Sequence, residues 1–148
     1  MRAQLSIDLL LAVALVSITL VGLVNIAQEN IAGAKEMDGA AKVKVFAIDL
    51  RDTVAKVYAA GDGFAVKKTF PFKLDGGDYV VVYLNSTSKT VQVTARLGGN
   101  LYTTLQPLQV PLLADSSVTL TPSDPSLWVV CEYNETLGGR NVEVKKSP

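Results

Sequence analysis

A carboxylate stands directly before a long apolar run near the start of the chain. Asp8 precedes residues 9–26, LLLAVALVSITLVGLVNI, which are 18 residues without a charge. An acidic side chain at the edge of a membrane helix costs free energy, up to about 2.5–3.5 kcal/mol at the bilayer centre, and such residues usually have a partner and a function. Asp8 therefore offers ion pairing in an apolar environment, with a cation from its own chain or from a neighbouring one.

Two tripeptides offer a second kind of chemistry, the attachment of a glycan to an asparagine. Asn85-Ser86-Thr87 and Asn134-Glu135-Thr136 both match the N-x-[ST] acceptor pattern without proline. Each lies in a predicted turn after a strand, where a sugar has room to attach. Such triplets also occur by chance, so Asn85 and Asn134 are candidates whose use requires this part of the chain to face the outside of the cell.

The composition argues against an enzyme. The 148 residues contain no histidine, which is the commonest general base and metal ligand, and a single cysteine. Serine and threonine hydroxyls have no histidine to activate them, and no glycine motif of the phosphate-binding kind is present. We therefore expect no catalytic residue, no metal site and no cofactor. Equal numbers of basic and acidic residues, 14 of each, argue against a nucleic-acid partner.

Four residues in the C-terminal part invite a chemical interpretation but favour a structural one. Asp75 and Asp78 flank two glycines, an arrangement typical of a turn, which we prefer to a weak calcium site. Cys131 lies in an apolar run, so we expect a core residue and not a reactive thiol. Trp128 in the same run is expected in the core as well, although an exposed aromatic contact is the alternative.

The element that positions Asp8 is a predicted helix of membrane length. Residues 9–26 span about 27 Å at about 1.5 Å per residue, close to the roughly 30 Å of a bilayer hydrocarbon core. One interpretation is a secretory signal peptide cleaved after Ala32-Gly33-Ala34. The apolar run is, however, longer than the roughly 7–15 residues of such peptides and has an acid directly before it. A plain single-span anchor is a second interpretation, and the third gives Asp8 a specific role.

The residues around Asp8 resemble the start of a known family. Gln4-Leu5-Ser6-Ile7-Asp8-Leu9-Leu10 is similar to the Q-x-S-x-E motif that opens archaeal type IV pilin precursors with class III signal peptides. The resemblance implies that a membrane enzyme, the prepilin peptidase, cuts between Ala3 and Gln4, so that residues 1–3 are a leader. Gln4, Ser6 and Asp8 then form the processing and assembly motif. The family generally has glutamate where this chain has Asp8, which carries the same charge on a side chain one methylene shorter.

The resemblance also implies how Asp8 acts and which partners the chain has. Cleavage before Gln4 creates an α-amine that is mostly cationic at neutral pH. Asp8 of one chain can pair with this amine in a neighbour and set the register of a helix bundle, because an unpaired charge there is costly. The alternative is that Asp8 caps its own helix or pairs with its own amine. The implied partners are other pilin copies in a homopolymer or mixed filament, an assembly ATPase and a membrane platform protein. The implied location is the cell membrane for the precursor and an extracellular surface filament afterwards.

Helical periodicity continues beyond the apolar run, so residues 4–62 are predicted to form one long N-terminal helix. Gly33 and Gly39 each cost about 1 kcal/mol relative to alanine in a helix, which predicts bending or local melting near residues 32–40. Residues 41–60 are amphipathic, and this pattern predicts packing against the domain that follows. The apolar stripe consists of Val43, Phe46, Ala47, Leu50, Val54, Val57 and Tyr58.

After Gly61-Asp62-Gly63, which predicts the end of the helix, the sequence period changes to two. Residues 63–148 contain short alternating runs separated by turn signals, of which Gly98-Gly99-Asn100 predicts a hairpin. Seven strands are expected, at 65–74, 79–84, 90–97, 101–105, 117–121, 127–133 and 141–145. The runs 79–84 and 127–131 are apolar on both faces and should be central. The chain is thus predicted to be α+β, with a long N-terminal helix followed by a small antiparallel β-sandwich or barrel-like head.

Three functional hypotheses remain open at this point. The leading one is a pilin, a structural subunit of an archaeal type IV pilus-like filament that polymerises through its N-terminal helix. The second is a single-span surface protein whose extracellular β-domain binds a partner and never polymerises. The third is an archaellin-like filament subunit, whose start usually differs from residues 4–8. The amino terminus discriminates between the first two, because cleavage between Ala3 and Gln4 has no purpose in a simple anchor.

Overall fold

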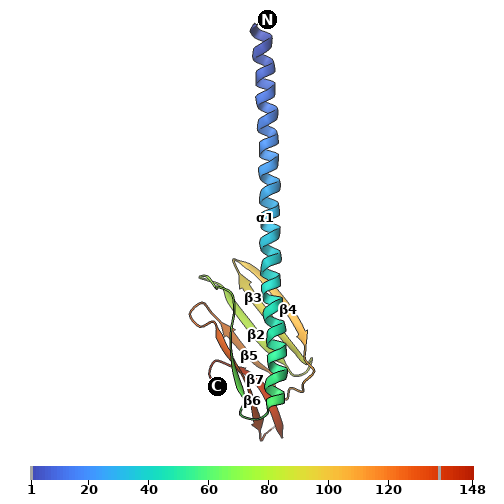
Figure 1. Cartoon of the computed structure of the whole chain (residues 1–148), viewed down its shortest axis with the longest axis vertical. Coiled ribbons are helices and arrows are strands. Elements are labelled where there is room, and N and C mark those ends of the chain that lie inside the picture. The colour runs from blue at the N-terminus through green and yellow to red at the C-terminus, as the bar shows by residue number, and fades with distance from the viewer. Residues whose placement is uncertain (1, 137) are drawn as a thin grey trace. The chain divides into compact units, whose positions relative to one another are not determined.

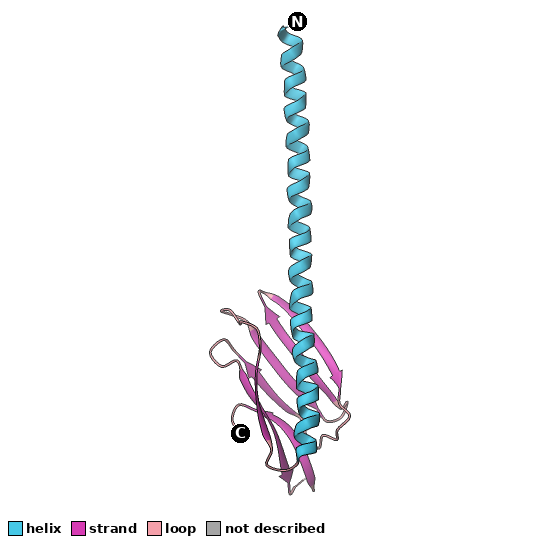
Figure 2. Cartoon of the chain, viewed as in Figure 1, coloured by secondary structure: helices cyan, strands magenta, loops and turns pink. Residues whose placement is uncertain are grey.

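A computed structural model describes residues 2–136 and 138–148, with side chains from Ile7 onward. The side chains of the expected leader, residues 1–3, and those of Gln4 and Ser6 are not among them. The expected cleavage site between Ala3 and Gln4 therefore lies outside the described side chains. In the described part of the chain, one helix, α1 (Arg2–Ala60), is followed by seven strands (Figures 1 and 2). The chain is α+β, as predicted.

The strands form two antiparallel sheets, and these confirm the expectation of a β-sandwich-like head. The first sheet has the order β1-β6-β7 and the second has the order β4-β3-β2-β5. The strand bounds are β1 (Ala65–Thr69), β2 (Tyr79–Asn85), β3 (Thr90–Leu97), β4 (Asn100–Pro107), β5 (Ser116–Leu120), β6 (Ser126–Asn134) and β7 (Gly139–Lys145). β2 and β6, which contain the two runs that are apolar on both faces, are inner strands of their sheets.

The hairpin between β3 and β4 forms where the glycine pair predicts it. Leu97 pairs with Asn100 across the turn, and Gly98 and Gly99 between them have φ values of +57° and +89°. A type I′ hairpin turn requires such left-handed values at both positions, and glycine adopts them at no steric cost. The turn therefore fixes the register of the whole β3–β4 pair.

β1 is shorter than the sequence pattern predicts. The expected strand ran to residue 74, but β1 ends at Thr69. Pro71 has no N–H to donate to a ladder, and the N–H of Phe70 donates to the carbonyl of Pro125 at 2.9 Å. Alternation alone could not show this, because Phe70, Phe72 and Leu74 remain apolar after they leave the sheet.

The helix belongs to two compact units, one ending at Asp38 and the other comprising Gly39–Pro148. The local melting expected near residues 32–40 is wrong, because the helix is continuous through this stretch. Gly39 instead has a packing role within the second unit. A Cβ at this position would lie 2.6 Å from Cζ of Tyr102, so glycine lets the ring of Tyr102 lie this close to the helix. At the other end, the helix stops at Ala60 before Gly61, whose φ is +99°.

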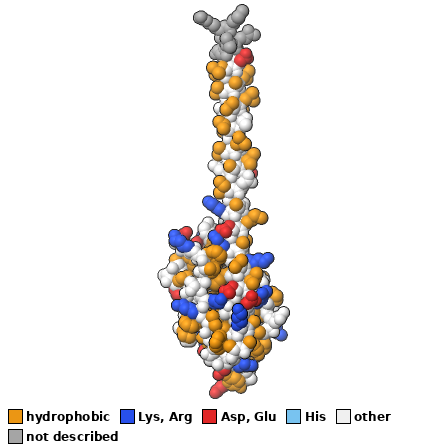
Figure 3. All heavy atoms as spheres, viewed as in Figure 1, with side chains coloured by type: hydrophobic (Ala, Val, Ile, Leu, Met, Phe, Trp, Pro, Cys, Tyr) orange, Lys and Arg blue, Asp and Glu red, His pale blue; other side chains and the backbone are white. Residues whose placement is uncertain are grey.

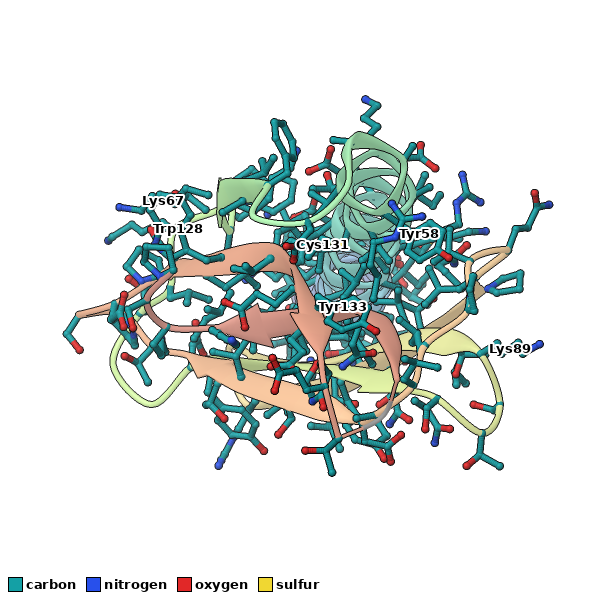
Figure 4. The ribbon with its side chains drawn as sticks, turned by 90° about the horizontal axis from the view of Figure 1, so that it is seen from below. Tyr58, Lys67, Lys89, Trp128, Cys131 and Tyr133 are labelled. Carbon is teal, nitrogen blue, oxygen red and sulfur yellow. The ribbon has the colours of Figure 1, made fainter. Side chains whose placement is uncertain are left out.

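The core of the second unit joins the amphipathic part of α1 to both sheets. The predicted stripe faces this core: its residues from Val43 to Val57 are buried, and Tyr58 is half-buried and packs against them. Phe46 of α1 meets Phe70 edge to face, with ring centroids 5.0 Å apart. Figure 4 shows this part of the helix packed beside the strands. The helix thus covers part of the core that the two sheets enclose.

The sequence interpretation of Trp128 as a core residue is wrong. Leu127 and Val129 on either side of it are fully buried, and Trp128 is half-buried because strand alternation turns it to the outer face of the sheet. Its cross-strand neighbours are Lys67 on β1 (both labelled in Figure 4) and Lys145 on β7. Cys131, by contrast, is fully buried, as predicted.

Candidate functional site

The face of the first unit seen in Figure 3 is covered largely by apolar side chains. The large apolar residues from Ile7 to Ile31 are all exposed, from 53% at Val24 to 71% at Ile18. The helix is long and apolar enough here to cross a membrane. A helix that is apolar all round needs lipid or other helices around it. A signal sequence has a similar composition, so this segment by itself defines a membrane-compatible helix and no more.

The polar side chains inside the apolar segment are partly satisfied by the helix itself. The hydroxyl of Ser17 donates to the carbonyl of Val13, and that of Thr19 donates to the carbonyl of Leu15, both at 2.8 Å. An unsatisfied hydroxyl in an apolar environment costs roughly 2–7 kcal/mol. These bonds remove that cost, so the two residues do not oppose burial in hydrocarbon or in a helix bundle.

Asp8 is exposed, and it makes no hydrogen bond or ion pair with any residue that the structure describes. Because α1 begins at Arg2, Asp8 lies beyond the first turn, where the free N–H groups of a helix are found. In the uncut chain Asp8 therefore does not cap its own helix. A cut before Gln4 would leave Asp8 as the fifth residue, close to the new helix start and its α-amine.

The second part of α1 is attached to the head mainly by its buried stripe, and charged contacts add little. Asp49 accepts a hydrogen bond at 2.8 Å from Lys68 of β1, and such exposed pairs are worth about 0–1 kcal/mol. The guanidinium of Arg140 on β7 lies 5.2 Å from the ring centre of Tyr58, a contact worth about 0.5–1 kcal/mol at an exposed site. Burial of apolar side chains therefore dominates this attachment.

The candidate glycan acceptor Asn85 is the last residue of β2. Its Oδ1 accepts a hydrogen bond from the N–H of Ser88 at 2.8 Å, which closes the turn to β3. The amide nitrogen Nδ2, to which a sugar would be joined, has no hydrogen-bond partner among the described residues. The side chain is half-buried.

The candidate acceptor Asn134 is the last residue of β6 and pairs with Gly139 of β7. Asn134 is half-buried, and it makes another interaction besides this pairing, so it is not free. Glu135 follows it in an exposed turn, where the N–H of Gly138 donates to the Glu135 carbonyl at 3.3 Å. The sequence places both acceptors in turns after strands, whereas each is in fact the last, paired residue of its strand, directly before the turn.

Asp115 organises the surroundings of Asn85, and sequence analysis missed it. One carboxylate oxygen accepts the N–H and the hydroxyl of Ser86 at 2.7 and 2.6 Å. The other accepts the phenol of Tyr83. Hydrogen bonds from the Ser86 side chain, Tyr83 and the Ser86 main chain hold the pKa of Asp115 below its usual value. The bond to Asp115 raises the pKa of Tyr83. No local motif marks Asp115, because its partners lie about 30 residues away in sequence.

The remaining chemical candidates have structural roles. Asp78 closes its own turn and the β3–β4 hairpin: its carboxylate accepts the N–H of Asp75 at 3.0 Å and that of Gly98 at 2.9 Å. Burial raises the pKa of the Cys131 thiol, which makes it a poorer nucleophile. Within the described ranges, no group of three or more histidine, cysteine, aspartate or glutamate side chains is placed to hold a metal ion.

The geometry thus defines a class of protein: a membrane-compatible apolar helix that continues into an antiparallel β head. No protein-family model matches the chain, and no curated protein or solved structure matches it either. What the chain does must therefore be argued from its own residues, above all from Asp8, the apolar segment and the buried stripe.

Proposed function

We propose that this chain is a pilin, a structural subunit of an archaeal type IV pilus-like surface filament. The observation that carries the proposal is the change of character within α1. Residues 7–31 expose apolar side chains on all sides, whereas the stripe from Val43 to Tyr58 faces the head. A simple anchor needs no continuous helix beyond the bilayer. A filament subunit needs one part that packs among copies of itself and another that carries the head.

The energetics of assembly fit this arrangement. In the membrane, residues 9–26 contact lipid, and in a filament they contact the same residues of other copies. This exchange is nearly neutral in hydrophobic terms, so packing and polar contacts must supply the specificity. The resemblance to pilins implies that a separate ATPase and a platform protein supply the work of extraction.

Asp8 supplies the specific contact in this proposal. The prepilin peptidase cuts between Ala3 and Gln4 and exposes the α-amine of Gln4. The free carboxylate of Asp8 then pairs with this amine in a neighbouring subunit. In a helix bundle of low dielectric, a shifted register leaves one charge unpaired, which is costly, so the pair selects one axial register. Glycans on Asn85 and Asn134 belong to the same proposal, because both turns would face the outside.

The experiment that tests this proposal compares two variants of Asp8 in the native host. Asp8→Ala removes the carboxylate, and Asp8→Glu restores the residue that the pilin motif usually carries. We expect Asp8→Ala to be expressed and membrane-bound but to give few or no surface filaments by electron microscopy. We expect Asp8→Glu to assemble filaments like the parent chain.

The controls separate assembly from expression. Immunoblots of membrane fractions must show equal amounts of the parent chain and both variants. Asp52→Ala, an exposed aspartate of the head part of α1, serves as the matched control and should assemble normally. Normal filaments from Asp8→Ala would remove Asp8 from the mechanism, and a parent chain that forms no filaments would favour the non-polymerising surface protein.

A further inference from the structure

The two sheets of the head have four edge strands, and they differ in how their edges are protected. β1 carries Lys67 and Lys68, and β7 carries Arg140, Glu143 and Lys145. Charges of this kind discourage pairing with another strand. β5 is short and lies beside β7, where the N–H of Val144 donates to the Ser116 hydroxyl at 3.0 Å. That leaves β4 as the edge without such protection.

β4 combines length, an open edge and exposed apolar side chains. It is eight residues long, carries no charge and pairs with β3 alone. Leu101 and Leu105 are 63% and 58% exposed on its outer face, with exposed Thr103 between them. An exposed edge strand with these properties is a template for pairing with another strand.

The hairpin register shows which main-chain groups are free. The residues that flank a two-residue turn, Leu97 and Asn100, form a hydrogen-bonded pair. By alternation, Leu101, Thr103 and Leu105 point their N–H and C=O groups away from β3. In the part of the chain that the structure describes, no loop or side chain bonds to these groups. Three donors and three acceptors are thus presented in a row.

The sequence of this edge is symmetric about Thr103. If two copies pair antiparallel with Thr103 opposite Thr103, then Leu101 of each copy lies opposite Leu105 of the other. All three outward-facing positions then form hydrogen-bonded pairs, and the leucines form apolar cross-strand pairs. We infer that β4 is a homotypic docking edge, at which a second copy of this chain adds its own β4 in this antiparallel register.

The side of β4 that faces α1 is not filled completely. An open cavity of 330 Å³ lies between α1 and β4, lined by Ala40, Val43, Lys44 and residues 101–104. In the inferred pair, Tyr102 of each copy stays packed against α1 of its own copy, and the two four-stranded sheets become one sheet of eight strands.

The symmetry of the contact determines where it operates. A twofold axis at Thr103 reverses the direction of residues 39–60 of α1 in the second copy, so the two copies cannot be successive subunits of one polar filament. Pairing over so few residues also buries far less than the roughly 1,200–2,000 Å² of stable interfaces. It becomes effective where many heads face one another. If the chain forms filaments, as proposed above, this edge joins filaments or cells side by side.

A site-specific disulfide tests the pairing without relying on filaments. The full chain in detergent carries Thr103→Cys, and it is oxidised mildly at several protein concentrations. Hydrogen-bonded antiparallel pairs have Cα atoms about 5.5 Å apart, within the roughly 4.4–6.8 Å that a disulfide spans. We expect covalent dimers of Thr103→Cys to form several-fold faster than those of Thr119→Cys, a matched exposed threonine on β5. The parent chain, whose only cysteine is buried, should form none.

A charge swap tests the register. In the Thr103→Cys chain, Leu101→Lys or Leu105→Glu alone should slow dimer formation, because a charge then faces a leucine. The two changes together place each lysine opposite a glutamate and should restore it. Equal rates for Thr103→Cys and Thr119→Cys would overturn the docking edge. A double variant as slow as the single variants would overturn the register. Thermal unfolding of each variant shows that the head remains folded.

Discussion

Residues 9–26 and residues 41–60 of α1 are both rich in apolar side chains, but they place them differently. In the first segment the apolar residues surround the helix and all the large ones are exposed. In the second they form one stripe, which is buried against the sheets, while residues such as Lys44 and Lys56 remain exposed. The width of the apolar surface therefore indicates the environment of each segment: lipid or other helices for the first, and a folded head for the second.

The glycines of α1 show the same contrast. A Cβ at Gly22 or Gly33 would meet nothing within 4 Å, whereas a Cβ at Gly39 would clash with Tyr102. The first two positions therefore have no packing reason for glycine within this chain, and Gly39 has one. Glycine in α1 thus allows close packing at Gly39, whereas nothing in the chain itself explains it at Gly22 and Gly33.

Shortening one leucine in each segment of α1 should give the largest difference between them. Leu50 is 1% exposed and Leu15 is 65% exposed. We expect Leu50→Ala to lower the free energy of unfolding of the head by about 2–5 kcal/mol, because it leaves a cavity in the core. We expect Leu15→Ala to change it by less than about 0.5 kcal/mol. Denaturant unfolding of the detergent-solubilised chain, followed by the fluorescence of Trp128, measures both. Similar losses for the two variants would contradict the division.

A lysine in each segment tests the environment of the first one. Leu15→Lys places a charge near the middle of residues 9–26, where it costs about 2.5–3.5 kcal/mol in a bilayer. We expect less of this variant in alkali-washed membranes. Val45→Lys is the matched control, because Val45 is exposed on the head part of α1, and it should leave both membrane association and head stability unchanged. A membrane fraction of Leu15→Lys equal to that of the parent would argue against a spanning segment.

Alanine at Gly33 and alanine at Gly39 should change stability in opposite directions. Gly33→Ala should stabilise the helix by about 1 kcal/mol, since alanine is the better helix former. Gly39→Ala gains the same propensity but loses about 1–3 kcal/mol to overpacking against Tyr102, so a net loss is expected. Hydrogen exchange measures the first effect and head unfolding the second. Adding Tyr102→Leu to Gly39→Ala should recover stability, and a Gly39→Ala head that is more stable than the parent would contradict the close approach.

The smallest expected effect concerns pH and belongs to the head alone. The pKa of Asp115 is lowered in the folded chain by its bonds to Ser86 and Tyr83. Its contribution is therefore complete above the usual aspartate pKa of about 3.9, and it is lost as pH falls through the lowered value. Asp115→Asn should unfold more easily at neutral pH and should be less sensitive to acid than the parent. Asp52→Asn is the control, and equal acid profiles for Asp115→Asn and the parent would contradict this role.

Local patterns in the sequence predict much of this fold. The stripe from Val43 to Tyr58, the seven strands and the Gly98-Gly99 turn depend on helical or strand alternation and on turn chemistry, which neighbouring residues determine. Where such a pattern meets a hidden constraint, the prediction is wrong. Alternation carries β1 past Thr69, although Pro71 cannot donate to the ladder, and overall apolarity places Trp128 in the core, although its position in the strand turns it outward.

The features of the candidate site can be predicted only where residues adjacent in sequence form them. Asp8, the apolar run and the two acceptor asparagines are visible in the sequence. The hydrogen bonds to Asp115, the approach of Tyr102 to Gly39 and the free edge of β4 depend on contacts between segments that are distant in sequence. These contacts follow from the way the strands pair, and no motif within one segment specifies that pairing.

The proposal requires that the chain is processed as a pilin and assembled through its N-terminal helix. The most direct test is to shear filaments from the cell surface and to determine the terminal peptide of this chain by mass spectrometry. We expect a chain that begins at Gln4 and is recovered in the filament fraction. A surface chain that retains Met1 or Arg2, or one that begins near Lys35, just after Ala32-Gly33-Ala34, would contradict it and leave the head as the functional part of the molecule.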